Sequence, residues 1–426
     1  MTSRIALAAM ASVIAAPAFA ADLGGNCCAD LEERIAELEA TTARKGNRRV
    51  SLTVSGHVNE MMVFWSGDQA NSLDDSGFLV ATNNSSRSRF RFTGSANINA
   101  EWSAGFLIEV GVRGTNNSQS ANFNAADLNE KPGLDVRHEA LYIDSKRLGR
   151  VWLGHTGSAT EGITEICIGC TSGQGPDTGP YLGGFQPLGA AGRNWQFLAV
   201  SDAGRTFAGE GDRRDIVMYV SPALAGFTLS AAAGSDRFYD VALRYAGEFN
   251  GIRLAAGVGY QKSNEQTTSS NKGFSGGCTA ITVVNVTRVD CEAIGASASA
   301  MHVPTGLYLM GAMGRNTDNN SNVAPATGST DTSWYVTAGV NRRFHVLGAT
   351  NIYGEFGNSQ REIGLLAGQQ TEMTWWGVGI NQTIDAAAMD IYLQFKHFEG
   401  QQTAGLNNGA PISDLDMVAL GAIIRF

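Results

Sequence analysis

From Val50 to the C-terminus, apolar and polar residues alternate with a period of two, and this pattern constrains the fold more than any other feature of the sequence. In the segment 50–64, most even positions are apolar, and Ser, Thr, His and Asn fill the odd positions up to 59. Because successive side chains of a strand point to opposite faces, the pattern predicts β-strands with one apolar and one polar face. A soluble β-sandwich would show the same alternation in a single strand, so the argument rests on its repetition.

The same alternation recurs along the chain. It is found at 90–98, 106–113, 241–245, 252–260, 334–341 and 389–396. After residue 20, no apolar stretch reaches the roughly 20 residues that a membrane-spanning helix needs, so any insertion into a membrane is expected through strands. An apolar outer face and a polar inner face are typical of a membrane β-barrel with a wet lumen.

The connections between these segments alternate in length. Short connections are expected at 99–102, 145–149, 222–225, 247–251, 303–306, 344–349 and 384–388. Long polar connections are expected at 66–86, 114–134, 157–212, 262–292, 315–332, 358–372 and 399–414, with one short member of this series at 235–238. Short turns at one end and long loops at the other are typical of outer-membrane barrels. Because the intervening segments number about sixteen, we predict an all-β, 16-stranded antiparallel transmembrane β-barrel over residues 49–426.

The first 20 residues have the three parts of a secretory signal peptide. Arg4 gives a positive start, residues 5–16 are apolar, and Ala18-Phe19-Ala20 supplies the small residues of a cleavage site. We therefore expect residues 1–20 to be removed and the rest of the chain to be exported.

Residues 21–48 differ from everything after them. Leu31, Ile35 and Leu38 have the spacing of a coiled-coil seam. A stretch this short is marginal as an isolated helix, so two interpretations stay open: a short oligomeric coiled coil, or a fraying helix that leads into the barrel. In both, residues 21–48 form a helical extension in the periplasm, outside the barrel.

The even number of cysteines fits an oxidising compartment. The pairings that are local in sequence are Cys167 with Cys170 and Cys278 with Cys291. The neighbours Cys27 and Cys28 are hard to join to each other without strain, so they are candidates for bonds between chains. No second pair with ligand spacing lies near Cys167 and Cys170, which disfavours a zinc site. We expect no metal and no other cofactor.

The overall charge and the histidines exclude two classes of function. The net charge of -9 and the pI near 5.2 argue against a nucleic-acid partner. The six histidines are scattered over different segments. No Gly-x-Ser-x-Gly elbow and no His-Glu-x-x-His motif appears in a recognisable sequence context. We therefore expect that the chain is not an enzyme.

Several short motifs resemble those of the Gram-negative general porins, most closely the alphaproteobacterial branch of that family. They are Ser88-Arg-Phe-Arg-Phe-Thr-Gly-Ser95, Leu148-Gly-Arg-Val-Trp-Leu-Gly154, Tyr219-Val-Ser-Pro-Ala-Leu-Ala-Gly-Phe227, Leu243-Arg-Tyr-Ala-Gly247 and Ile423-Ile-Arg-Phe426. Their order and spacing cover nearly the whole mature chain. Residues 27–34 depart from the enterobacterial porins and look like the N-terminal extension of some alphaproteobacterial members.

The resemblance implies an architecture and a set of partners. It implies a 16-stranded barrel that forms a homotrimer, with the third long loop, about 157–212, folded into the lumen. Such a barrel contacts outer-membrane lipid and lipopolysaccharide. The resemblance also implies that Phe426 is the signal read by the barrel-assembly machinery.

The last strand has one apolar face and one mixed face. Ile424 and Leu420 share a face with Phe426, whereas Met417 and Ala419 lie on the other face, which is not cleanly polar. That second face is therefore expected to meet a packed loop or a subunit interface. The strand is expected to close against a first strand near Val50.

A diffusion channel needs a narrow polar path, and alternate arginines are candidates for one side of it. Arg87, Arg89 and Arg91 project from one face of a strand. In lipid, each would cost roughly 2–4 kcal/mol at mid-depth, so the lumen is the consistent side. Arg113 and Arg137 are further candidates for this basic wall. The alternative is that these arginines only line the wall near the mouth.

The opposing charges are expected from the long loop. Glu161, Glu165 and Asp177 lie near the Cys167–Cys170 pair, whose disulfide would stiffen a constriction. The alternative is an exposed acidic loop without contact to the pore. Glu109 points inward by parity and is expected to pair with a neighbouring arginine.

These features predict an outer-membrane porin for passive diffusion of small hydrophilic solutes and ions. Opposed charges across a narrowing orient polar solutes and discourage apolar ones. The alternative is a channel selective for sugars or anions. A structural tether of the outer membrane and a barrel enzyme are less favoured.

Overall fold

A computed structural model describes residues 50–67, 76–113, 133–171, 174–175, 207–234, 237–264, 266–267, 281–283, 286–288, 290–319, 330–362, 368–402 and 414–426. Residues Arg49–Phe426 form one compact unit. The predicted signal peptide and the predicted extension 21–48 lie outside the described residues. Within the described residues, no helix has the length and apolar character needed to cross a membrane.

Long strands dominate this unit. They are β1 (Ser51–Gly67), β3 (Arg89–Asn97), β4 (Trp102–Arg113), β5 (Gly133–Ser145), β6 (Gly149–Gly157), β7 (Arg213–Val220), β8 (Phe227–Gly234), β9 (Phe238–Phe249), β10 (Ile252–Ser263), β14 (Cys291–His302), β15 (Leu307–Asp318), β16 (Thr330–His345), β17 (Gly348–Arg361), β18 (Thr371–Ile384), β19 (Met389–Gln402) and β20 (Leu415–Arg425). Shorter elements are β2 (Ser76–Thr82), β11 (Gln266–Thr267), β12 (Ile281–Val283), β13 (Val286–Arg288) and the single 3-10 turns η1 (Asn84–Ser86) and η5 (Asp385–Ala387).

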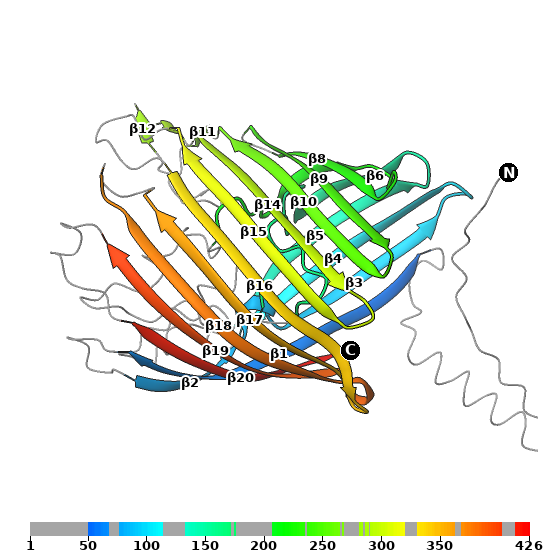
Figure 1. Cartoon of the computed structure of the whole chain (residues 1–426). Coiled ribbons are helices and arrows are strands. Elements are labelled where there is room, and N and C mark those ends of the chain that lie inside the picture. Colours follow the sequence, from blue (N-terminus) through cyan, green and yellow to red (C-terminus); the bar gives the residue numbers. More distant parts are fainter. Residues whose placement is uncertain are drawn as a thin grey trace, which may run out of the picture. The chain divides into compact units, whose positions relative to one another are not determined.

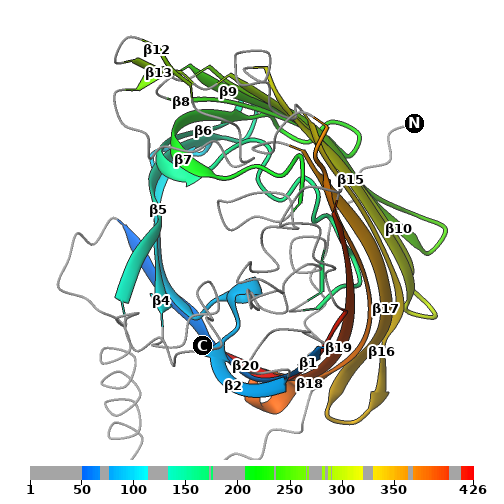
Figure 2. The same ribbon diagram turned by 90° about the vertical axis from the view of Figure 1, so that its left-hand side faces the viewer.

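The long strands close into a ring (Figures 1 and 2). From β3 onward each strand pairs antiparallel with the next, β10 pairs directly with β14, and β20 pairs with β1. The strands β2 and β3 pair with successive parts of β1, at 60–66 and 51–57. They therefore act as one strand that is interrupted at 83–88, and 16 strands surround the lumen. The predicted 16-stranded antiparallel barrel is confirmed.

The two ends of the ring meet at a seam beside Gly56. The Phe426 N–H donates to the Gly56 carbonyl at 3.1 Å, and the Gly56 N–H donates to the Phe426 carbonyl at 2.9 Å. A Cβ atom at Gly56 would lie 2.5 Å from the backbone carbonyl oxygen of Arg89 and 2.6 Å from the Phe426 ring, so only glycine admits this approach. The predicted closure of the last strand against the first is confirmed.

The alternation predicted from sequence separates the two faces of the barrel. On β1, Val54 and Val58 are exposed on the outer face, whereas Asn59 and Met61 are buried on the inner face. The inner face of β20 is apolar because its Met417 belongs to a buried cluster of inward side chains. That cluster includes Met61, Val63, Met373, Trp375, Phe398 and Ala419.

The short turns lie where the sequence predicts them. They are 98–101, 146–148, 221–226, 250–251, 303–306, 346–347 and 385–388. One of the two-residue turns joins β9 to β10 through Asn250 and Gly251, both with positive φ, at 49° and 75°. Asn-Gly is the favoured pair for a two-residue hairpin because its backbone twist matches that of the strands.

Two of the expected long loops contain strands. The segment 66–86 carries β2, and the segment 262–292 carries a three-stranded sheet of β11, β13 and β12. Their β-branched residues, as in Ile281-Thr282-Val283, favour extended backbone. The prediction that the segments 66–86 and 262–292 are only polar loops was therefore wrong.

The apolar outer face predicts that a charged side chain placed on it lowers the stability of the barrel. Leu393 is exposed on the outer side of β19. We expect Leu393→Arg to lower the free energy of unfolding in lipid vesicles by about 2–4 kcal/mol, because the guanidinium would face hydrocarbon. Urea titration followed by tryptophan fluorescence measures the change. Leu393→Ala is the control, and an arginine variant as stable as the alanine variant would contradict the outward assignment.

Candidate pore constriction

The strand β3 turns two arginines toward a carboxylate on its neighbour. Arg89 Nη1 donates to Glu109 Oε1 at 3.3 Å, and Arg91 Nε donates to Glu109 Oε2 at 2.7 Å. Arg91 and Glu109 are partners in the β3–β4 register. The Glu109 side chain has no exposed surface. The expectation that Glu109 points inward and pairs with an arginine is confirmed.

A bulge on β5 brings a third arginine to the same carboxylate. Glu109 is paired with His138 and Val110 with Val136, so Arg137 is an extra residue in the β4–β5 ladder. A bulge of this kind re-aims side chains. Arg137 Nε accordingly donates to Glu109 Oε1 at 2.7 Å.

Two further ion pairs flank this group. Arg87 Nη2 lies 2.6 Å from Asp135 Oδ2, and Arg213 Nη1 lies 3.1 Å from Glu161 Oε1. We call Arg87, Arg89, Arg91, Arg137 and Arg213 the basic wall.

Arginines outnumber the carboxylate at the centre of the basic wall. Arg89, Arg91 and Arg137 share the single carboxylate of Glu109, so this group of four side chains has two more positive than negative charges. Arg89 is repelled by Arg137, Arg213 and Arg91, so the arginines stand close together. Burial of Glu109 among them lowers this repulsion, because opposite charges interact more strongly away from water.

The described start of the long loop runs along a different part of the inner wall. The Thr160 N–H donates to Asp240 Oδ2 at 2.8 Å on β9, and the Ile166 N–H donates to Ser297 Oγ at 3.1 Å on β14. Farther on, Gln174 Nε2 donates to the Tyr308 hydroxyl at 2.7 Å on β15. In Figure 2, β4 and β5 lie on one side of the lumen and β15–β17 on the other. The described parts of this loop, 158–171 and 174–175, thus extend away from the basic wall toward the far side.

Buried polar groups hold this segment in place. Arg244 donates to the carbonyls of Ala159 and Glu161 at 2.7 and 2.8 Å. Glu210, at the returning end of the loop, accepts from the Thr164 N–H at 2.8 Å. Because each of these groups satisfies a backbone atom, the segment follows one path along the wall.

The predicted acidic residues of the loop have different surroundings. Glu161 lies beside Arg213, and Glu165 is exposed. Asp177 lies outside the described residues. The predicted disulfide between Cys167 and Cys170 is present, with a Cα–Cα distance of 5.6 Å.

Other predicted residues are only partly described. The backbone of Arg113 pairs with Gly133, but its side chain lies outside the description. Cys291 is buried and disulfide-bonded. Cys27, Cys28 and Cys278 lie outside the described residues, so their pairings stay predictions.

Sequence reasoning did not single out Arg213, Asp135 or Arg244. Arg213 follows the long loop directly, and only the fold brings it to Glu161. Arg244 occupies an inward position in the alternation of 241–245, which was a usable signal for a lumen residue.

The geometry defines a class of protein: a membrane β-barrel whose lumen is narrowed by an inward segment and lined by charged side chains. The family model described as Gram-negative porin matches residues 6–403. The chain belongs to this family, and it is an outer-membrane porin channel of the Gram-negative type. The predicted porin family and the predicted channel function are confirmed, and the alphaproteobacterial branch stays a prediction. No curated protein matches the sequence.

Solved structures of outer-membrane proteins share the fold. An anion-selective porin from Comamonas acidovorans is 14% identical, with a TM-score of 0.55, covering 88% of this chain and 100% of that chain. The outer membrane channel DcaP of Acinetobacter baumannii is 10% identical, with a TM-score of 0.55, covering 90% and 100%. The trimer form of OmpT of Vibrio cholerae is 11% identical, with a TM-score of 0.53, covering 88% and 99%.

Glu109 is the residue on which the basic wall depends. We expect Glu109→Gln to lower the free energy of unfolding by about 3 kcal/mol, because removing one partner of a buried ion pair leaves the others uncompensated. Denaturant titration of the refolded protein measures the loss. Asp135→Asn removes a partner that is 28% exposed and serves as the control, with a smaller expected loss. Equal losses in the two variants would show that Glu109 has no special role.

Proposed function

We propose that this porin passes small hydrophilic solutes and ions by passive diffusion and prefers anions. Its constriction is formed by the basic wall, where Glu161 pairs with Arg213, and by the inward segment 158–171 with the exposed Glu165. One observation carries the proposal: Arg91 shares the Glu109 carboxylate with Arg89 and Arg137, and its side chain is 42% exposed.

A fixed positive wall acts on solutes through its field. In a narrow lumen with low-dielectric walls, field lines are focused and the local concentration of counter-ions rises. Anions would therefore enter more readily than cations. The fold likeness to a porin described as anion-selective is consistent with this preference.

A sugar-selective channel is less favoured by the positions of the inward aromatic side chains. A sugar path needs aromatic faces open to the lumen, but Tyr335, Trp375, Tyr392 and Phe398 are buried. The inward Tyr142 and Trp152 are half-buried, and the Arg150 guanidinium lies over both of their rings. We propose a channel, and not an enzyme, as the role of the barrel.

We also propose a homotrimer whose subunits meet around Glu60. This carboxylate is exposed on the outer face of β1, between the outward residues Val58 and Met62, and accepts from the Thr82 hydroxyl at 2.9 Å. A carboxylate within an apolar band is costly against lipid, and a neighbouring subunit could shield it. The trimer form recorded for OmpT of Vibrio cholerae supports the same number of subunits.

The two ends of the chain have features suited to export and to assembly in the outer membrane. We propose that residues 1–20 direct export and are removed, and that residues 21–48 form a periplasmic extension. Phe426 is exposed at the seam, where the barrel-assembly machinery could read it. The outer face would contact outer-membrane lipid and lipopolysaccharide.

Ion preference tests the basic wall directly. In planar bilayers with a salt gradient, the wild-type channel is expected to show stepwise conductance and a reversal potential that favours anions. Arg89→Gln together with Arg91→Gln should move the reversal potential toward cation preference, because two positive charges leave the lumen.

The control for this measurement is Arg343→Gln. Arg343 pairs with Asp385 beside the short turn 346–347, away from the basic wall. The Arg343→Gln variant should leave the reversal potential nearly unchanged. If the double variant and the control give the same reversal potential as the wild type, the basic wall does not set selectivity. A protein that inserts and conducts nothing would overturn the open channel.

A further inference from the structure

A hollow lies in the apolar outer face of the barrel, over β10, β14 and β15. Ala256, Ala298 and Gly311 are neighbours in the registers of these three strands. They share the outward face with large exposed residues such as Val258 and Met313. Because the three are small, they leave a hollow of about 610 Å³ above the sheet.

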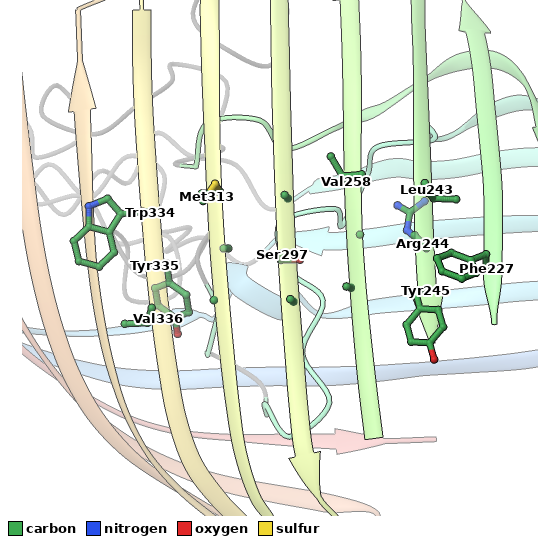
Figure 3. Close-up of a pocket in the computed structure, with 16 residues that line it drawn as sticks. Phe227, Leu243, Arg244, Tyr245, Val258, Ser297, Met313, Trp334, Tyr335 and Val336 are labelled. Atoms are coloured by element: carbon green, nitrogen blue, oxygen red, sulfur yellow. The ribbon is translucent and has the colours of Figure 1, made fainter. Parts of the chain in front are cut away.

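Aromatic side chains form the two walls of this hollow (Figure 3). On one side, Phe227 packs against Tyr245 with ring centroids 4.8 Å apart. On the other side, Trp334 lies beside Val336 and packs against Phe356 with ring centroids 5.3 Å apart. The hollow is therefore a trough with a floor of small residues, which we call the outer groove.

A positively charged side chain, that of Arg315, lies beyond the groove, toward the end of the barrel that carries the long loops. Arg315 is on the same outward face of β15 as Gly311 and Met313, and its side chain is exposed. Arg315 is four positions beyond Gly311, roughly 13 Å along a strand. In the described part of the chain, Arg315 donates to the Thr330 hydroxyl at 3.3 Å and takes part in no ion pair.

We propose that the outer groove binds one acyl chain of a lipid whose phosphate group is held by Arg315. An acyl chain is a thin apolar cylinder that fits a trough between two walls. In a bilayer the chain is already out of water, so the gain comes from van der Waals packing against the floor and the aromatic walls. Arg315 then lies on the extracellular side, where headgroups are found, because long loops are extracellular in such barrels.

Charge and position favour a lipid over a second copy of this chain. The exposed Arg315 guanidinium complements a phosphate, since charge-assisted bonds to phosphate are strong for arginine. The subunit contact proposed around Glu60 lies on β1, which is not among the strands of the groove. The proposal goes beyond the channel function and does not depend on which residues form the constriction.

The test uses the full exported chain, stripped of lipid in detergent and studied by native mass spectrometry. Phosphatidylglycerol and phosphatidylcholine with identical acyl chains are the probes. We expect the wild type to retain one phosphatidylglycerol per chain, with about fivefold preference over phosphatidylcholine, as one arginine near the headgroups allows. Arg315→Gln should abolish this preference.

Filling the groove tests the acyl-chain site separately. Ala298→Phe should lower phosphatidylglycerol retention about tenfold, because the ring takes the place of the chain. Ala298→Leu should give an intermediate loss if the phenylalanine variant folds poorly. Ala231→Phe makes the same change on the outward face of β8, outside the groove lining, and should retain lipid as the wild type does.

Several outcomes would overturn the proposal. If Ala298→Phe and Ala298→Leu retain phosphatidylglycerol at the wild-type level, the acyl chain does not lie in the groove. A preference for phosphatidylglycerol that persists in Arg315→Gln would show that Arg315 does not hold the phosphate. A change in the number of chains per particle in Ala298→Phe, with lipid retention unchanged, would assign the groove to a second copy. All groove variants should keep the wild-type conductance, so failure here is distinguishable from failure of the channel proposal.

Discussion

The structure depends on one constraint: backbone N–H and C=O groups in hydrocarbon need partners within the protein. No water is available there, and each unsatisfied group costs several kcal/mol. A sheet meets this requirement only when its first and last strands pair. The contact of β20 with β1, completed by the two bonds between Gly56 and Phe426, is therefore the condition for every other feature of the barrel.

Closure of the ring also fixes what the lumen contains. Alternate side chains point inward, so each strand contributes to the inner wall at regular intervals. On β3 and β4 these positions hold the arginines and Glu109. On β9, β14 and β15 they hold Asp240, Ser297 and Tyr308, which bind the inward segment. The same ring therefore supplies a charged surface on one side and an anchorage for the loop elsewhere.

Much of the barrel could be predicted from the sequence because its rules are local. The parity of β1, the Asn250-Gly251 turn and the inward position of Glu109 each follow from a few neighbouring residues. Arg137 was among the predicted residues of the basic wall, but the bulge beside it leaves no local signal, because it depends on how β5 pairs with β4.

Contacts between distant segments were equally out of reach for sequence reasoning. Arg213 meets Glu161 only because β7 pairs with β6 after a long excursion of the chain. The apolar inner face of β20 was visible as an anomaly. Its explanation, packing of Met417 with side chains of β1 and β18, needed the fold.

The seam between β1 and β20 has a consequence for protein synthesis. The ribosome makes β1 early and β20 last, so the earliest long strand must wait for the end of translation before its second edge is covered. A product that stops before Leu415 exposes the edges of both β1 and β19. Such open edges pair readily with other chains and promote aggregation. A nonsense mutation near the end of the coding sequence would therefore be as damaging as one in the middle.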